Sequence, residues 1–283
     1  MNYRHIYHAG NFADVVKHAV LALAIERMKL KEAAFRVIDT HAGIGSYDLA
    51  VEAARKTGEW EGGIGRLLGP LAEPIPLAVA PLVASYLEVV ASANRPGELT
   101  CYPGSPAIAR QLLRPQDRLV VNELHPQDGE ALRAVFARDR QTTVMELDGW
   151  IALKALLPPK ERRGVILIDP PFEVAGEMER LVKALREAVK RFATGTYVLW
   201  YPIKDVAKVR RFKRALRELG LAKLLVAELS IRPDGDPAVL SGTGLAILNP
   251  PFEIERQLRV LLPFLAQRLA VAPGGGHVIE WLV

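Results

Sequence analysis

Cysteine is nearly absent from the chain, which contains Cys101 and no other. An intramolecular disulfide is therefore excluded, and the composition fits a reducing compartment. Long apolar runs are missing too. The longest uncharged one, residues 74–87, is shorter than the roughly 20 residues of a membrane-spanning helix, and Pro76 and Pro81 interrupt it. The first residues also lack the apolar stretch of a secretory signal. We expect a cytoplasmic protein with no membrane partner.

A large excess of charge of one sign is absent as well. The 283 residues include 37 Lys and Arg against 32 Asp and Glu, which leaves a formal net charge of +5. Half of the residues are hydrophobic (50%), a proportion that excludes a disordered chain. The length suits one large α/β domain, or such a domain with a smaller one inserted. A mildly basic chain is compatible with a polyanionic partner if its cations cluster.

Seven short apolar runs, rich in β-branched residues, end in turn residues and are followed by longer helical patterns. They are residues 35–38, 118–121, 142–145, 164–168, 196–200, 223–226 and 244–248. Alternation of strands and helices is typical of βαβ units around a mostly parallel sheet. The sequence therefore predicts an α/β fold with a seven-stranded, doubly wound, Rossmann-like sheet.

The connection between the first two runs is unusually long for a βα unit. Its residues 81–93 space apolar side chains as a helix does, and joints rich in Pro and Gly flank them. We therefore predict a Rossmann-like domain of residues 1–45 and 106–283, with an inserted helical subdomain at 46–105. Ahead of the sheet, residues 13–29 also have the pattern of an amphipathic helix.

Ligands of open α/β sheets bind beyond the carboxyl ends of the strands, so the residues after each run are candidates. Asp39 opens a turn whose glycines, Gly43 and Gly45, allow the backbone to approach a ligand closely. Glu123 follows the second run, where a carboxylate can accept two ribose hydroxyls. Asp148 follows the third and could accept an adenine amine. A tight turn without a ligand and simple helix N-caps are the alternatives for these positions.

The fourth run ends in Asp169-Pro170-Pro171-Phe172, the most specific motif in the chain. Two prolines fix φ and remove two N–H donors, so the turn is rigid and presents acceptors. A carboxylate and a carbonyl can hold both hydrogens of an NH2 group, and the Phe172 ring can stack on a displaced base. As a bare tetrapeptide, Asp-Pro-Pro-Phe is also a helix-start signal.

A second copy of the motif, Asn249-Pro250-Pro251-Phe252, ends the seventh run. It is the weaker candidate for the reacting centre because no acidic strand ends precede it nearby.

Short motifs spread over the whole chain resemble the RlmJ family of bacterial 23S ribosomal RNA adenine-N6 methyltransferases. The matching stretches are Tyr3-Arg4-His5, His8-Ala9-Gly10-Asn11, Ala13-Asp14, Lys17-His18, Asp39-Thr40-His41-Ala42-Gly43, Tyr102-Pro103-Gly104-Ser105-Pro106, Glu123-Leu124-His125-Pro126, Asp148-Gly149, Asp169-Pro170-Pro171 and Arg191-Phe192-Ala193-Thr194-Gly195-Thr196-Tyr197. One departure is Phe172, where the family usually has Tyr, so a phenol hydrogen bond is lost while stacking is retained.

The resemblance implies a class I methyltransferase that uses S-adenosyl-L-methionine, releases S-adenosyl-L-homocysteine and modifies N6 of one adenine in 23S ribosomal RNA. It further implies a monomer without an obligate protein partner. The implied cofactor-binding residues are His18, His41, Gly43, Ser105, Glu123, Asp148, Gly149 and Asp169. The implied substrate-binding residues are Tyr3, His5, Lys17 and Phe172, and the implied catalytic residues are Asp169, Pro170, Pro171 and Phe172.

Several alternatives stay open. A DNA adenine or glutamine methyltransferase would share the chemistry of the fourth run, and a non-catalytic RNA-binding module is a different class. The absence of a complete Gly-x-Gly-x-x-Gly disfavours a nicotinamide oxidoreductase. A metal site at His5, His8, Asp14 and His18 is disfavoured because methyl transfer from a sulfonium needs no Lewis acid, so we expect none.

Candidate phosphate contacts are Arg162, Arg163, Lys183, Arg186, Lys190, Arg191, Lys204, Lys208, Arg210, Arg211, Lys213, Arg214 and Arg217, each of which could equally lie on a solvated helix face.

Overall fold

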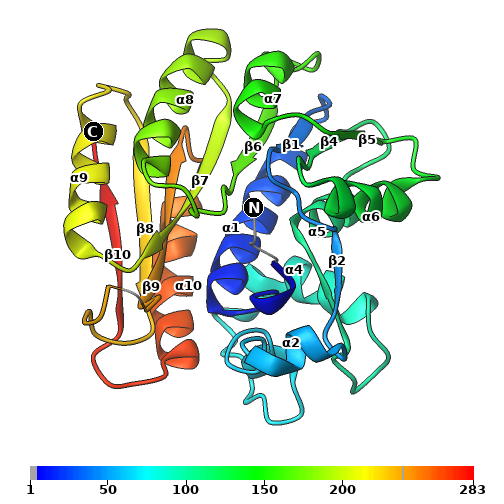
Figure 1. Ribbon diagram of the computed structural model, residues 1–283, viewed down its shortest axis with the longest axis vertical. Helices are drawn as coiled ribbons and strands as arrows, with labels where there is room; N and C mark the ends of the chain where they lie inside the picture. The colour runs from blue at the N-terminus through cyan, green and yellow to red at the C-terminus, as the bar shows by residue number, and fades with distance from the viewer. Residues whose placement is uncertain (1–4, 238) are drawn as a thin grey trace.

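A sheet of eight strands forms the centre of the protein (Figure 1). The computed structural model describes residues 5–237 and 239–283. The sheet has the order β10-β8-β9-β7-β6-β1-β4-β5. Its strands are β1 (Arg36–Asp39), β4 (Arg118–Asn122), β5 (Thr142–Met145), β6 (Gly164–Ile168), β7 (Thr196–Ile203), β8 (Leu224–Ser230), β9 (Gly242–Leu248) and β10 (Gly276–Trp281).

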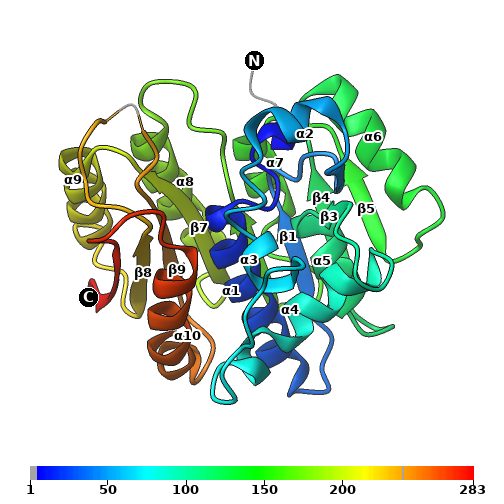
Figure 2. The same ribbon diagram turned by 90° about the horizontal axis from the view of Figure 1, so that it is seen from below.

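The helices cover both faces of this sheet (Figure 2). They are α1 (Phe12–Lys29), α2 (Glu52–Thr57), α3 (Gly65–Leu68), α4 (Ala80–Ser92), α5 (Ser105–Leu112), α6 (Pro126–Phe136), α7 (Gly149–Leu156), α8 (Glu177–Arg191), α9 (Val206–Arg217) and α10 (Ile254–Leu269), with a 3-10 turn at His5–Tyr7. The start of α1 is set by Asn11, whose side-chain oxygen accepts the N–H groups of Ala13 and Asp14.

Strand directions confirm the predicted class I methyltransferase fold. Neighbouring strands are parallel from β7 through β6 and β1 to β4 and β5. Strand β9 is antiparallel to both β7 and β8, which makes β8 point the same way as β7. The carboxyl ends of β1, β4, β5, β6, β7 and β8 therefore lie at one edge of the sheet. This shared edge is where a ligand site is expected.

All seven predicted runs form strands. The sheet has eight strands and not the predicted seven, because β10 is an additional strand at its edge. Strand β10 pairs antiparallel with β8 at the edge of the sheet. An edge strand is only partly covered, and here His277 and Val278 are exposed. Glycine, histidine and glutamate dilute the apolar signal of this segment, so it lacks the buried run by which the other strands were recognised.

Alternating side chains of the strands divide the core into two layers. On β6, Val165 and Leu167 pack on one face, in the same cluster as buried residues of α1, α4, α5 and α10. Ile166 and Ile168 pack on the other face with α7, α8 and α9. Continuous apolar runs are thus required because both sides of the strands are covered.

Residues 46–105 begin and end at a two-stranded antiparallel sheet, β2 (Ser46–Asp48) with β3 (Cys101–Pro103). Between these strands lie α2, α3 and the helix predicted at 81–93, which is α4. Buried side chains of α4, such as Val83 and Tyr86, pack in the same cluster as α1. The division into a Rossmann-like domain and an inserted subdomain stays a prediction. In the part of the chain that the structure describes, every helix is too short or too polar to span a membrane.

Candidate active site

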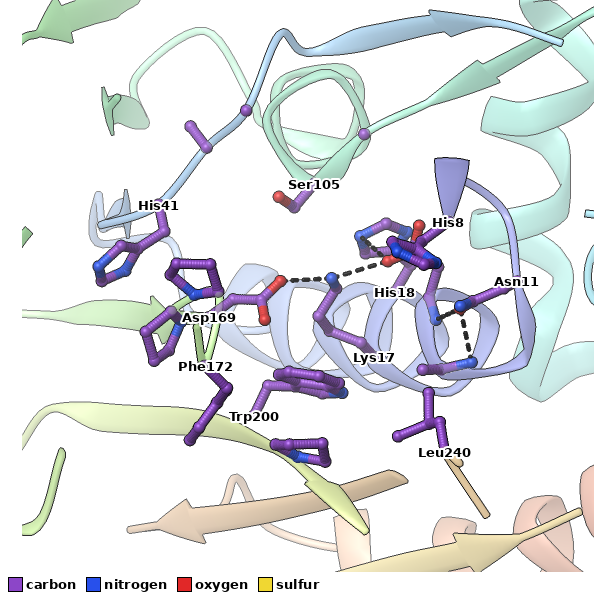
Figure 3. A pocket seen from close by; sticks show the side chains of 18 of the residues that line it. His8, Asn11, Lys17, His18, His41, Ser105, Asp169, Phe172, Trp200 and Leu240 are labelled. Atoms are coloured by element: carbon purple, nitrogen blue, oxygen red, sulfur yellow. Dashed lines mark hydrogen bonds and ion pairs between the residues drawn. The ribbon is translucent and has the colours of Figure 1, made fainter. Parts of the chain in front are cut away.

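A cavity of about 580 Å³ opens at the carboxyl edge of the sheet. Twelve of the residues singled out from the sequence line it: His18, His41, Gly43, Ser105, Glu123, Asp148, Gly149, Lys17, Asp169, Pro170, Pro171 and Phe172. Figure 3 shows side chains of α1, β1 and β6 converging on one space. Tyr3 and the side chain of His5 lie outside the described part of the chain. Residues from distant parts of the sequence are therefore brought together by the strand order.

The carboxylate of Glu123 is fixed by two main-chain donors beyond β4. Gly43 N–H donates to its Oε2 at 2.8 Å, and His125 N–H donates to its Oε1 at 2.9 Å. Because each carboxylate oxygen has more than one acceptor site, both retain the capacity to bind a further hydroxyl. The same contact closes the glycine turn after β1 onto the end of β4.

Asp148 caps α7, as the helix-cap alternative predicted, and it also lines the cavity. Its Oδ1 accepts the N–H groups of Trp150 and Ile151 at 2.9 and 3.2 Å. Next to it, Gly149 lies against His41 so closely that a Cβ at this glycine would stand 2.4 Å from His41 Nε2. Burial lowers the pKa of His41 to about 4, so the ring is neutral at pH 7.

Asp39 ends β1 as a buried carboxylate beneath the cavity. It accepts a hydrogen bond from Ser105 Oγ at 2.6 Å and a longer one from His41 N–H at 3.3 Å. Burial raises its pKa to about 6, and the nearby Asp169 charge adds to the effect. These two contacts explain why Ser105, at the start of α5, lies beside the glycine turn.

Asp169 forms a buried ion pair with Lys17 of α1. Lys17 Nζ donates to Asp169 Oδ2 and lies 2.7 Å from Asp14 Oδ1 (Figure 3). Burial alone would lower the pKa of Lys17, but attraction to the two carboxylates outweighs burial and raises it. Lys17 is therefore a charged group that holds the Asp169 carboxylate in place from the neighbouring helix.

A chain of hydrogen bonds continues behind this ion pair. His18 Nδ1 lies 2.6 Å from the hydroxyl of Tyr102, and that hydroxyl lies 3.0 Å from the hydroxyl of Tyr86. All three side chains are fully buried. The His18 ring is thus oriented by a strand and a helix of the segment 46–105, so this segment helps to shape the cavity wall.

An aromatic pair lies on the other side of Asp169. Phe172 packs edge-on against Trp200, with ring centroids 5.5 Å apart. The indole N–H of Trp200 donates to Thr243 Oγ1 at 2.7 Å, which fixes the ring. Phe172 has φ of 53°, a left-handed conformation that is uncommon outside glycine and is often retained at functional sites. The pair forms an apolar wall on which a flat base can stack.

Comparisons with known proteins identify the family of the chain. A family model described as "RsmJ: Ribosomal RNA large subunit methyltransferase D, RlmJ" matches residues 32–283. The chain belongs to the RlmJ family. Two curated RlmJ-family relatives are both called ribosomal RNA large subunit methyltransferase J. The Haemophilus influenzae protein is 43% identical and the Escherichia coli K12 protein 44% identical, each over 100% of this chain and 99% of its own.

A solved structure shows the same fold. Protein LPL1258 from Legionella pneumophila is 35% identical and matches with a TM-score of 0.86, over 96% of this chain and 98% of that chain. Membership in the RlmJ family, together with the class I fold, implies use of S-adenosylmethionine.

The second Pro-Pro motif of this RlmJ-family chain lies at the opposite edge of the sheet. Because β9 is antiparallel to β7, its last residue Leu248 pairs with Tyr197 near the start of β7. Asn249 there donates to the carbonyls of Ala193 and Gly195 at 2.8 and 2.9 Å. Phe252 is 81% exposed. The Asn249 motif therefore stabilises the turn before β7 and lies far from the cavity.

Sequence reasoning missed Asp14 and Trp200 as site residues. Asp14 lies one helical turn before Lys17, a spacing that places both side chains on one face of α1 and could have indicated the pair. Trp200 ends a predicted strand next to β6 in the sheet, and a strand-end aromatic was the available signal. Nothing in the sequence indicated that Thr243 would fix the indole.

Histidines near the start of the chain take part in contacts other than metal binding. His8 Nδ1 lies 3.0 Å from both carboxylate oxygens of Glu59, and Asn11 Nδ2 donates to the same carboxylate at 2.9 Å. Within residues 5–237 and 239–283, no group of three or more His, Cys, Asp or Glu side chains is arranged to hold a metal ion.

Proposed function

We propose that the protein transfers a methyl group from S-adenosyl-L-methionine to the exocyclic N6 of one adenine in 23S ribosomal RNA. The observation that carries the proposal is the position of Asp169. It lies between strand ends rich in acceptors for the cofactor and the Phe172–Trp200 wall, and Lys17 holds it there. The printed names of the two relatives support ribosomal RNA of the large subunit as the substrate.

The donor set of the cavity fits the cofactor. The Glu123 carboxylate would bind the ribose hydroxyls, and Asp148 would accept the adenine amine through the oxygen that does not cap α7. His18 and Ser105 would contact the amino acid end, with Asp39 behind Ser105, whose hydroxyl it binds. The neutral His41, Gly43 and Gly149 would complete the wall. When bound, the cofactor supplies an electrophilic methyl group.

The protein's own contribution is to orient the target amine. Asp169 and a carbonyl of the Pro170–Pro171 turn would accept the two N6 hydrogens, which directs the nitrogen lone pair at the methyl group and reduces its conjugation with the ring. Phe172 and Trp200 would hold the ring plane, a contribution of about 1–3 kcal/mol per stacked base. Positioning of this kind, with polar complementarity, is sufficient for direct displacement.

Lys17 would hold the Asp169 side chain in one rotamer, and the N6 proton would leave to water or to that carboxylate after transfer. N6 is accessible only in an unstacked adenine, which favours a loop, bulge or helix end of the RNA. We propose no metal ion, and we propose that the protein acts as a monomer without an obligate protein partner.

The direct test is incubation of the purified protein with labelled S-adenosylmethionine and unmodified 23S ribosomal RNA, followed by digestion to nucleosides. We expect label in N6-methyladenosine, with unchanged yield after a chelator is added. Asp169→Ala should abolish labelling while the circular dichroism spectrum is retained. Asn249→Ala is the matched control, because it alters the same motif at the remote edge.

Different outcomes separate the alternatives. Label in DNA or in a glutamine side chain, but not in RNA, would replace the substrate and keep the chemistry. RNA binding without label in any acceptor would favour a non-catalytic binding module and would refute the proposal.

A further inference from the structure

Three cations line the cavity beyond the aromatic wall. Arg180 lies in the first turns of α8, which follows β6. Lys204 follows β7, and Arg232 follows β8. Because β6, β7 and β8 all end at the carboxyl edge, the three residues occupy the same rim. Arg180 and Lys204 are exposed, whereas Arg232 is half-buried.

Lys204 and Arg232 form no ion pair among the described residues, whereas Arg180 interacts electrostatically with Glu177, one helical turn before it on α8. Arg232 Nε is buried and makes no hydrogen bond. A buried N–H without an acceptor is costly, so a group that supplies an oxygen atom there would be favoured. An unpaired guanidinium at the wall of a cavity is therefore a binding group without a ligand.

Several of the basic residues that the sequence analysis named as candidate phosphate contacts already have partners within the protein. Lys190 pairs with Glu187 at 2.7 Å, and Lys213 lies 3.0 Å from Glu228. Arg163 donates to main-chain carbonyls before β1, at the far edge of the sheet. The structure thus selects these three cations by their position at the cavity.

Charge is divided along the cavity. The ends of β1, β4 and β5 lie on one side of β6 and contribute Glu123, Asp128 and Asp148 to the lining, whereas the ends of β7 and β8 lie on the other side. The cationic rim therefore borders the half that contains Trp200. A polyanion would be attracted to this half and repelled from the acidic half.

We propose that Arg180, Lys204 and Arg232 bind backbone phosphates of the RNA strand on either side of the target adenine. The inference rests on the proposed function, because it assigns the strand path for a base held at Phe172 and Trp200. Phosphate contacts fix register without reading sequence, so the rim would align the strand while the aromatic wall and Asp169 select the base.

The test compares two triple variants. One is Arg180→Gln with Lys204→Gln and Arg232→Gln. The control is Lys31→Gln with Arg140→Gln and Lys160→Gln, three exposed cations at the amino edge of the sheet, which removes the same net charge. Each is measured for binding of a fluorescent 23S RNA fragment at several salt concentrations, for the KM of RNA, and for S-adenosylmethionine affinity by calorimetry.

Each contact to a single strand contributes a salt exponent of about 0.7, or roughly fivefold in affinity near 0.1 M salt. We expect the rim triple variant to lose about a hundredfold in RNA affinity, with the salt slope reduced by about 2. Its affinity for S-adenosylmethionine should be unchanged. The control should retain most of its RNA affinity.

Equal losses in the two triple variants would overturn the inference, as would an unchanged salt slope in the rim variant. Loss of DNA binding with RNA binding retained would also overturn it. If the wild type binds RNA through the rim but labels no adenine, the rim stands and the proposed reaction fails, so the two failures are distinguishable.

Discussion

Replacing Lys17 by Met tests the buried ion pair at the centre of the site. Methionine has a similar length, so packing is largely retained while the charge is lost. Lys17 and Asp14 are 3% and 2% exposed, and the Asp169 side chain is 13% exposed. Removing one partner of a buried pair typically costs about 3–5 kcal/mol. Asp169 reaches the cavity, and Asp14 still accepts Gly10 N–H at 3.0 Å, so both carboxylates keep some compensation. We therefore expect Lys17→Met to lower the free energy of unfolding by about 3 kcal/mol at pH 7.5, the lower end of that range.

The loss should depend on pH with a defined sign. Without Lys17, Asp14 is a buried carboxylate that has lost its neighbouring cation, and burial disfavours the charged form of a carboxyl. The folded variant should therefore bind protons more readily than the unfolded chain, so its stability relative to wild type rises as the pH falls. The difference in the free energy of unfolding between the variant and the wild type should therefore become smaller from pH 7.5 towards pH 5. Asp39 contributes in the same direction, because the Lys17 charge lowers its pKa in the wild type and the variant lacks that charge.

Urea unfolding followed by circular dichroism measures this difference. The double variant of Lys17→Met and Asp14→Asn removes the buried charge as well as its partner, so it should recover about half of the lost stability and lose most of the pH dependence. A loss that is independent of pH and equal in the single and double variants would refute the reasoning, because packing alone would then account for it.

Three further predictions concern the cavity. Trp200→Ala should reduce kcat/KM for RNA by roughly 5- to 150-fold, as loss of one stacked base implies, and Trp200→Phe should restore most of it, with S-adenosylmethionine affinity unchanged in both. Affinity for S-adenosylmethionine should rise as the pH increases through about 6, where Asp39 ionises, and Asp39→Asn should flatten that profile in calorimetry. Gly149→Ala places a Cβ 2.4 Å from His41 Nε2 and should weaken S-adenosylmethionine binding at least tenfold, whereas Gly235→Ala, in open space, should not.

Local patterns were sufficient for most of the fold. The seven buried runs are continuous and apolar because helices cover both of their faces, so each could be recognised from its own residues. Strand β10 was missed because an edge strand needs no such run. The cap at Asp148 followed from its own sequence position. Strand ends likewise pointed to Glu123 and Asp169, since position after a strand decides access to the cavity.

Contacts between distant residues could not be predicted in this way. Lys17 and Asp169 are separated by 152 residues, and their pairing depends on α1 packing beside β6. Thr243 fixes Trp200 only because β9 runs antiparallel beside β7. No pattern within either segment encodes such a contact. It follows from the strand order, which is a property of the whole chain.

The two Pro-Pro-Phe motifs show how strand direction decides chemistry. Both follow apolar strands, and both begin with a side chain that can accept an amine hydrogen. At Asp169, the strand is parallel to β1, so the motif meets the cavity and Lys17. At Asn249, the antiparallel β9 carries the motif to the far edge, where its amide binds main-chain carbonyls. Exchange of Asp169 and Asn249 between the sites should therefore not transfer activity, because the second site has neither the cavity nor the cation of the proposed site.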